Sequence, residues 1–312
     1  AKADAREVHE NLKMQDAENV HMHKDCKEGH CMNSQKIAVV VDSCGDVPKE
    51  YAAEHDIHVL PVHVIYPERD YLDGVDLDPL MIYDRFPGEI PMPSAGEVDD
   101  FINDLVKAGY EKMIAVCISP HLSSTVDTVR MVAAEHTDIK SFVFDTKNIS
   151  IGSGIFAIWV ASKVEDGMSF DEITAKLEAK RYDSHLMFYM NSLDYLHKGG
   201  RIGHVTYVIG NTLNIKPLIS CDKEGIYYMP AKVRGISRAK QKLFDLLVGY
   251  ARDNECWVVI PHGNNKKEAD EMEVMIHEAA PHAKILFKEQ ITASMAVHTG
   301  PGLLGLEVLV NP

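Results

Sequence analysis

The sequence predicts an α/β fold with a mainly parallel sheet in its N-terminal half. Short, fully apolar runs such as residues 37–41 are typical of strands buried on both faces. Helical patterns alternate with these runs, which favours βαβ units with helices on both faces of the sheet. The 312 residues are 46% hydrophobic, enough for two cores. We therefore expect two domains, residues 36–181 and 182–312, after a polar extension at residues 1–35.

Four strands are expected in the N-terminal domain, at residues 37–41, 57–65, 112–118 and 141–145. The intervening helices are expected to begin at Pro48, near Glu97, near Ser123 and near Gly152, and proline is favourable at a first helical position. Ligands of such sheets bind beyond the carboxyl ends of the strands. This rule places four parts of the chain around one rim: residues 42–46, Ser94, 123–125 and 146–150.

The second domain is expected to contain both parallel and antiparallel strands. Strands are expected at residues 186–190, 256–260 and 284–288, an antiparallel pair at 215–221 and 226–233, and helices at 237–251 and 266–279. The sequence His298-Thr299-Gly300-Pro301-Gly302 separates two apolar runs near the end of the chain. Two glycines flank a proline there, so the backbone can turn sharply beside one imidazole.

Bulk composition excludes several classes of function. The net charge of −15 opposes binding to nucleic acid. The six cysteines are scattered and do not indicate a disulfide framework, so we expect a reducing, cytoplasmic location. No apolar run reaches the ~18 residues that span a bilayer, and no signal peptide is recognisable. The first residue is Ala, which suggests a processed product or a piece of a longer protein.

Residues 1–35 are polar, with a helical pattern followed by a stretch typical of disorder. They include several side chains that can bind zinc or copper: His21, His23, Cys26, His30 and Cys31. Their spacing matches none of the common zinc motifs. A linker is favoured over a metal site, and no metal or other cofactor is expected.

Nucleotide and hydrolase motifs are missing. Residues 152–157 read GxGxxA, but six residues separate them from the preceding strand and the chain stays helical to Lys163, so these glycines indicate close helix packing. Neither the P-loop pattern GxxxxGK[ST] nor the nucleophile elbow GxSxG occurs. A P-loop kinase and an α/β-hydrolase are both disfavoured.

Three segments offer groups that can bind an anion. Ser123, Ser124 and Thr125 begin a helix, where backbone N–H groups can face a ligand, although a simple N-cap explains them equally. Ser94 presents a hydroxyl in a proline-rich loop, or caps the helix that follows. Residues 197–203 form a basic, glycine-rich turn suited to a phosphate or an acidic partner, or to a helix C-terminus.

These motifs together resemble the DegV family, which includes the FakB-like fatty-acid-binding proteins of bacteria. The resemblance covers about residues 36–312. It rests on eight segments in this order: 42–48, 71–76, 124–125, 145–150, 193–203, 214–217, 232–235 and 298–302.

The resemblance implies a two-domain protein that buries a long-chain fatty acid between its domains. It implies carboxylate contacts from Ser94 and His298, with a third polar contact near His63 and the loop of Ser124 and Thr125 close by. It also implies that a separate fatty-acid kinase converts the presented acid to an acyl phosphate. In some bacteria the two parts are fused, and residues 9–15 faintly resemble the end of the kinase-like part.

Two classes of function remain open. For a lipid carrier, the apolar helix that carries Ile155 and Trp159 can line the tunnel or belong to the core. For an enzyme acting on an acyl phosphate or another small anion, Arg201, Lys198 and Arg234 would converge on His298. The missing nucleotide motif favours the carrier.

Overall fold

The computed structural model describes residues 32–84, 92–205 and 214–312. The chain separates into two compact units, residues 1–34 and 35–312, and every element described below lies in the second. The candidate metal ligands between His21 and Cys31, and the kinase-like residues 9–15, lie outside the described residues.

The first sheet has four parallel strands, which confirms the expected fold class. Its order is β2-β1-β5-β6. The strands are β1 (Ile37–Asp42), β2 (Ile57–Leu60), β5 (Lys112–Cys117) and β6 (Lys140–Asp145). β1 is buried along its whole length, as its unbroken apolar sequence requires.

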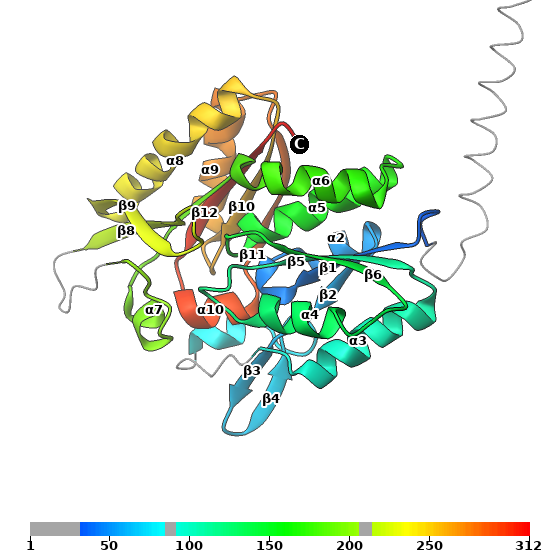
Figure 1. Ribbon diagram of the computed structural model, residues 1–312. Helices are drawn as coiled ribbons and strands as arrows, with labels where there is room; N and C mark the ends of the chain where they lie inside the picture. Colours follow the sequence, from blue (N-terminus) through cyan, green and yellow to red (C-terminus); the bar gives the residue numbers. More distant parts are fainter. Residues whose placement is uncertain (1–31, 85–91, 206–213) are drawn as a thin grey trace, which may run out of the picture. The chain divides into compact units, whose positions relative to one another are not determined.

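Helices cover both faces of this sheet (Figure 1). The five helices of this half are α2 (Lys49–Glu54), α3 (Ala95–Ala108), α4 (Thr125–Ala133), α5 (Ile151–Glu165) and α6 (Phe170–Lys180). α5 and α6 lie on one side and α3 and α4 on the other. Short 3₁₀ turns add η1 (Ser43–Gly45), η2 (Pro79–Asp84) and η3 (Arg181–Asp183).

The single strand expected at residues 57–65 is wrong, because the chain breaks at Pro61. Proline has no N–H to donate to a ladder, and the next amide, Val62 N, donates instead to Ser43 Oγ at 3.1 Å. Beyond the break, β3 (His63–Tyr66) pairs antiparallel with β4 (Arg69–Leu72) in a separate hairpin.

The second sheet has six strands in the order β11-β10-β12-β7-β8-β9. They are β7 (Ser184–Tyr189), β8 (Ile215–Cys221), β9 (Tyr227–Arg234), β10 (Cys256–His262), β11 (Lys284–Gln290) and β12 (Leu304–Val310). β10 and β11 are parallel and the other pairs antiparallel, including the expected β8–β9 pair. Helices α8 (Ile236–Asp253) and α9 (Lys266–Ala279) pack on its strands, and two short helices, α7 (Asp194–Lys198) and α10 (Ala293–Thr299), complete this half.

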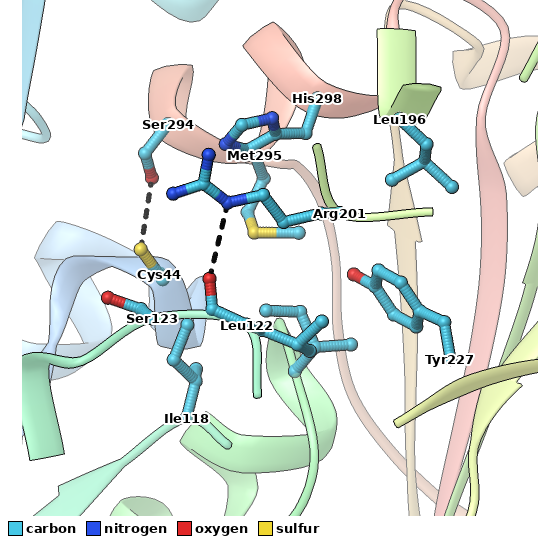
Figure 2. A pocket seen from close by; sticks show the side chains of 11 residues that line it. Cys44, Ile118, Leu122, Ser123, Leu196, Arg201, Tyr227, Ser294, Met295 and His298 are labelled. Atoms are coloured by element: carbon cyan, nitrogen blue, oxygen red, sulfur yellow. Dashed lines mark hydrogen bonds between the residues drawn. The ribbon is translucent and has the colours of Figure 1, made fainter. Parts of the chain in front are cut away.

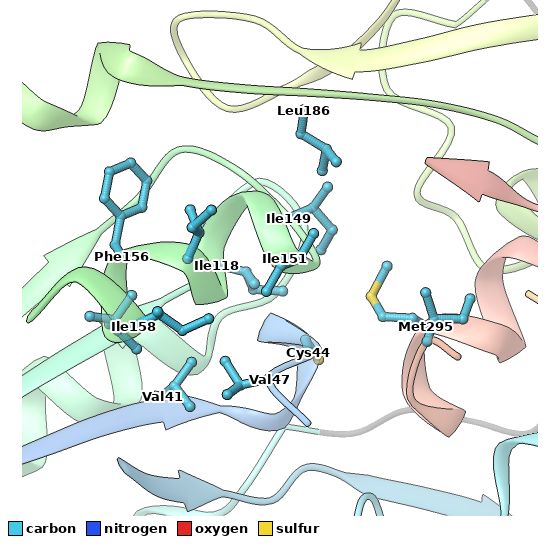
Figure 3. Close-up of a cluster of buried hydrophobic side chains, with 14 of the residues drawn as sticks. Val41, Cys44, Val47, Ile118, Ile149, Ile151, Phe156, Ile158, Leu186 and Met295 are labelled. Atoms are coloured by element: carbon cyan, nitrogen blue, oxygen red, sulfur yellow. The ribbon is translucent and has the colours of Figure 1, made fainter. Parts of the chain in front are cut away.

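Helix α5 packs against strands of both sheets, so its sequence is apolar on every side. Residues 151–161 are all buried, and the helix contacts β1 and β5 of the first sheet and β7 and β12 of the second. A Cβ on Gly154 would lie 2.0 Å from the carbonyl oxygen of Gly45, which confirms close packing as the role of this glycine. Figure 3 shows the resulting core, where Leu186 of β7 points toward Ile149 and Ile151.

One carboxyl group lies inside this core. Glu307, in the middle of β12, is 0% exposed. Its Oε1 accepts a hydrogen bond of 2.8 Å from Ser184 Oγ, and Oε2 has no partner among the described residues. Burial raises the pKa of Glu307 to about 8, against the opposing effect of this hydrogen bond. The folded protein therefore favours the neutral acid at pH 7.

The raised pKa of Glu307 makes stability depend on pH. The unfolded chain loses this proton near the ordinary pKa of Glu, about 4.3, whereas the folded chain keeps it to about pH 8. This group therefore lowers the free energy of unfolding by up to about 1.4 kcal/mol for each pH unit gained in that window. We expect Glu307→Gln to remove that contribution, and urea unfolding at pH 5, 6, 7 and 8 measures it.

The control is Glu289→Gln, which changes an exposed glutamate of β11 and should retain the pH dependence of the unmodified protein. If the free energies for Glu307→Gln and the unmodified protein run parallel across this range, the buried acid is not the cause.

Candidate functional site

A cavity lies where the carboxyl ends of β1 and β5 face helix α10 (Figure 2). Its space is about 420 Å³ when the adjoining open solvent is included. The lining residues are Cys44, Ile118, Leu122, Ser123, Ile149, Leu196, Arg201, Tyr227, Ser294, Met295 and His298. Three of the four segments expected around the rim contribute to this lining, through Cys44, Ser123 and Ile149.

Two buried carboxylates fix the start of α10. Asp73 Oδ1 accepts from the backbone N–H groups of Ala293 at 3.0 Å and Ser294 at 3.3 Å. Asp46 Oδ1 accepts from Thr292 N at 2.7 Å. The first N–H groups of any helix have no hydrogen-bond partner within the helix, and these three N–H groups lie at such a start. The motif residues Asp46 and Asp73 therefore position a helix more than 200 residues away in sequence.

Helix α10 presents Ser294 and His298 to the cavity together. The two residues are four apart, and this spacing places side chains on one face of a helix. After Thr299 the chain turns at Gly300, whose φ of 66° suits glycine. A Cβ there would lie 2.4 Å from the Tyr195 ring, so the HTGPG turn depends on this glycine for a close contact as well.

The basic, glycine-rich turn after α7 packs directly on the histidine. A Cβ on Gly199 would lie 2.3 Å from His298 Nδ1. The same turn carries Arg201, whose Nη1 donates to Gly199 O at 2.6 Å and whose Nε reaches Leu122 O at 3.4 Å. In Figure 2 the Arg201 guanidinium lies beside the imidazole.

The cavity combines one cation with a neutral imidazole. Burial, and then the nearby Arg201, lower the pKa of His298 to about 4, so the ring is uncharged at neutral pH. Within the described ranges the guanidinium of Arg201 donates to backbone oxygens of Leu122 and Gly199, and His298 Nδ1 is buried there without a hydrogen-bond partner. The site therefore suits a ligand that brings one negative charge into an apolar space.

Ser94 and His63 lie outside the lining of this cavity. The Ser94 hydroxyl donates to Glu97 Oε2 at 2.7 Å and accepts from Glu97 N, which together form a capping box at the start of α3. His63 contacts Asp70 at 3.0 Å and the same Glu97 at 2.8 Å. Both polar groups expected at the head group thus have local partners in the structure.

The three hydroxyl residues of the loop before α4 lie in different environments. Ser123 lines the cavity, and its Oγ lies 2.9 Å from Thr125 Oγ1. Thr125 is buried. Ser124 is exposed and its hydroxyl contacts Met92 Sδ at 2.9 Å. Of the three residues in this expected segment, only Ser123 is among the lining residues of this cavity.

The remaining candidate residues from the sequence lie away from the cavity lining. Lys198 and Arg234 are exposed, and neither lines the cavity, so only Arg201 of the three expected cations reaches it. Ile155 and Trp159 are 0% and 3% exposed within the core between the sheets and are not among the lining residues.

Sequence reasoning missed Ser294 and Tyr227 as site residues. Ser294 had a signal, because it lies one helical turn before His298. Cys44 lies in the expected rim segment 42–46, although it was not singled out as a contact. For Tyr227, the predicted hairpin of β8 and β9 did not show that the start of β9 lies at the cavity.

Residues 32–84, 92–205 and 214–312 contain no cluster of three potential metal ligands among His, Cys, Asp and Glu. No helix within these ranges is both long and apolar enough for a membrane span.

Comparison with known proteins identifies the family. The model described as "Uncharacterised protein, DegV family" matches residues 36–311. A DegV domain-containing protein of Clostridium acetobutylicum is 35% identical over 278 residues, covering 88% of this chain and 99% of the relative.

Two solved structures share the fold at 25% identity or more. One is described as DegV, a fatty acid binding protein from Bacillus subtilis, with 25% identity, a TM-score of 0.80, and coverage of 90% of this chain and all of that one. The other is a stearic acid-binding protein from Eubacterium ventriosum, with 26% identity, a TM-score of 0.79, and coverage of 88% and 98%. With a matching family model and close relatives along the same residues, this chain belongs to the DegV family.

Proposed function

We propose that the protein binds a long-chain fatty acid, with the carboxylate placed between Arg201 and His298. One observation carries the proposal: an arginine without a carboxylate partner among the described residues lies beside a buried, neutral histidine in a largely apolar cavity. The descriptions of the Bacillus subtilis and Eubacterium ventriosum proteins as fatty-acid-binding support it.

The expected binding energies suit an amphiphilic ligand that carries a single charge. Each buried methylene contributes roughly 0.8 kcal/mol, so a 16-carbon tail contributes on the order of 10 kcal/mol before the costs of ordering. A buried carboxylate without partners would cost several kcal/mol, which Arg201 and His298 offset through charge and hydrogen bonding. Leu122, Leu196 and Met295 provide the apolar contacts next to these groups.

We also propose further contacts between the bound fatty acid and the protein. For the carboxylate to contact Ser94 or His63, these side chains must give up the hydrogen bonds that they make to Glu97 in the structure. Contact of the tail with Ile155 or Trp159 requires packed core side chains to move apart.

We also propose that the bound acid is presented to a separate fatty-acid kinase, as the resemblance implies. This step is tested by mixing the loaded protein with such a kinase and ATP and measuring acyl phosphate. Formation of acyl phosphate by the protein and ATP without a kinase would support an enzyme instead.

An enzyme acting on an acyl phosphate is the second candidate, and the cavity supports it less. Burial raises the pKa of the Cys44 thiol well above its usual range, which leaves a poor nucleophile. Ser294 Oγ donates to Asp73 rather than to a histidine base. Lys198 and Arg234 do not join Arg201 at the cavity.

The first test is native mass spectrometry of the purified protein followed by lipid extraction. A co-purified fatty acid supports the proposal and gives its chain length. A protein that is empty and takes up no added fatty acid contradicts it.

His298→Ala tests the head-group contact. Hydrogen bonds to charged groups contribute roughly 1.5–3 kcal/mol, so we expect the affinity for palmitate to fall about 10- to 150-fold. Displacement of a fluorescent fatty acid measures the affinity, and thermal melting verifies folding. The matched control is His277→Ala on the exposed side of α9, which should bind as the unmodified protein does. Unchanged affinity in His298→Ala would rule out this assignment.

Gly199→Ala tests whether the basic turn positions the histidine. The φ of Gly199 is −73°, which alanine adopts freely, so the effect comes from the new Cβ, which would lie 2.3 Å from His298 Nδ1 and 3.3 Å from Tyr195 O. We expect weaker palmitate binding, and a shift of the His298 ring signals in NMR spectra. In the control, Gly249→Ala, the new Cβ has no neighbour within 4 Å among the described residues. Equal binding by both variants would show that this contact does not matter.

A further inference from the structure

The polar groups of the cavity differ in whether they can donate to a ligand. Ser294 Oγ donates to Asp73 Oδ2 at 2.5 Å. Ser123 Oγ pairs with Thr125 Oγ1 at 2.9 Å and accepts from Thr125 N at 3.3 Å. The Cys44 thiol points to Ser294 Oγ at 3.6 Å. These three side chains already use their hydrogen-bonding groups within the protein.

Tyr227 is different. Its side chain comes from β9, is 2% exposed, and lines the cavity. Figure 2 shows its hydroxyl directed into the cavity, from the wall opposite Ser294 and Cys44. The hydroxyl donates no hydrogen bond to another of the residues that the structure describes. A buried phenol of this kind is poised to donate to a bound molecule.

The surrounding structure fixes the position of Tyr227. Its ring meets Phe188 of β7 edge-on, with the ring centroids 5.9 Å apart. Its backbone oxygen accepts from His204 N at 2.8 Å. A Cβ on Gly203 would lie 2.9 Å from that oxygen, so the turn that carries Arg201 packs closely on Tyr227 as well as on His298.

We propose that the Tyr227 hydroxyl donates a hydrogen bond to the carboxylate of the bound fatty acid, as a third head-group contact with Arg201 and His298. The inference rests on the proposed function, and assigns the head group a donor from the second sheet. A carboxylate accepts about four hydrogen bonds, so three protein donors fit around one head group. Burial keeps the phenol protonated, because it raises the pKa of Tyr227 well above its usual range.

Tyr227→Phe tests the contact, because it removes the hydroxyl and keeps the ring that packs on Phe188. We expect the affinity for palmitate to fall about 10-fold, as for other hydrogen bonds to a charged acceptor. The affinity for hexadecanol, which has the same tail and no charge, should change less than about 3-fold. Both ligands are measured by displacement of a fluorescent fatty acid, with melting temperatures recorded alongside.

The matched control is Tyr189→Phe, a fully buried tyrosine of the other core cluster that is absent from the cavity lining. It should bind both ligands as the unmodified protein does. Unchanged palmitate affinity in Tyr227→Phe would overturn the proposal. So would an equal loss of affinity for the acid and the alcohol, which indicates packing. If the unmodified protein binds no palmitate, the proposed function itself fails.

Discussion

Two buried carboxylates at the start of one short helix control the arrangement of the cavity. Asp73 and Asp46 accept the leading N–H groups of α10, and this helix carries His298 and Ser294. Burying a carboxylate is costly unless its oxygens are paired, and leaving helix N–H groups unpaired inside a protein is costly as well. Each group supplies the partner that the other needs. Segments around residues 46, 73 and 293 are therefore fixed to one another before any ligand binds.

Arg201 is the one charged residue among those that line the cavity, although the chain as a whole is strongly acidic. The neighbouring imidazole of His298 stays neutral because it is buried. A second positive charge so close would repel the first, so a neutral histidine beside an arginine is the less costly arrangement. The same turn approaches His298 through Gly199 and Tyr227 through Gly203. Side chains at these glycines would separate the groups that the turn brings together.

The sequence could predict those features that depend on local pattern. The parallel strands follow from unbroken apolar runs, and His298 and Arg201 were found through motifs that the structure brings to one cavity. The strand at 57–65 failed because Pro61 removes a ladder donor. Ser94 was expected at the ligand although Glu97 follows three residues later, a spacing typical of a capping box. Tyr227 was not found, because the predicted hairpin of β8 and β9 does not by itself show that this strand begins beside the cavity.

Helix α5 has a consequence for how the chain can be divided. It has no solvent face along residues 151–161, because strands of both sheets pack on it, and one continuous hydrophobic cluster runs from β1 to β12. A cut near residue 182 would expose the side of α5 that now meets β7, and would leave the inner face of the second sheet uncovered. A boundary there divides the hydrophobic cluster that spans both halves of the chain, and leaves the second cluster, between Tyr189 and Val310, in one piece. Fragments made at this point would expose apolar surface and tend to aggregate.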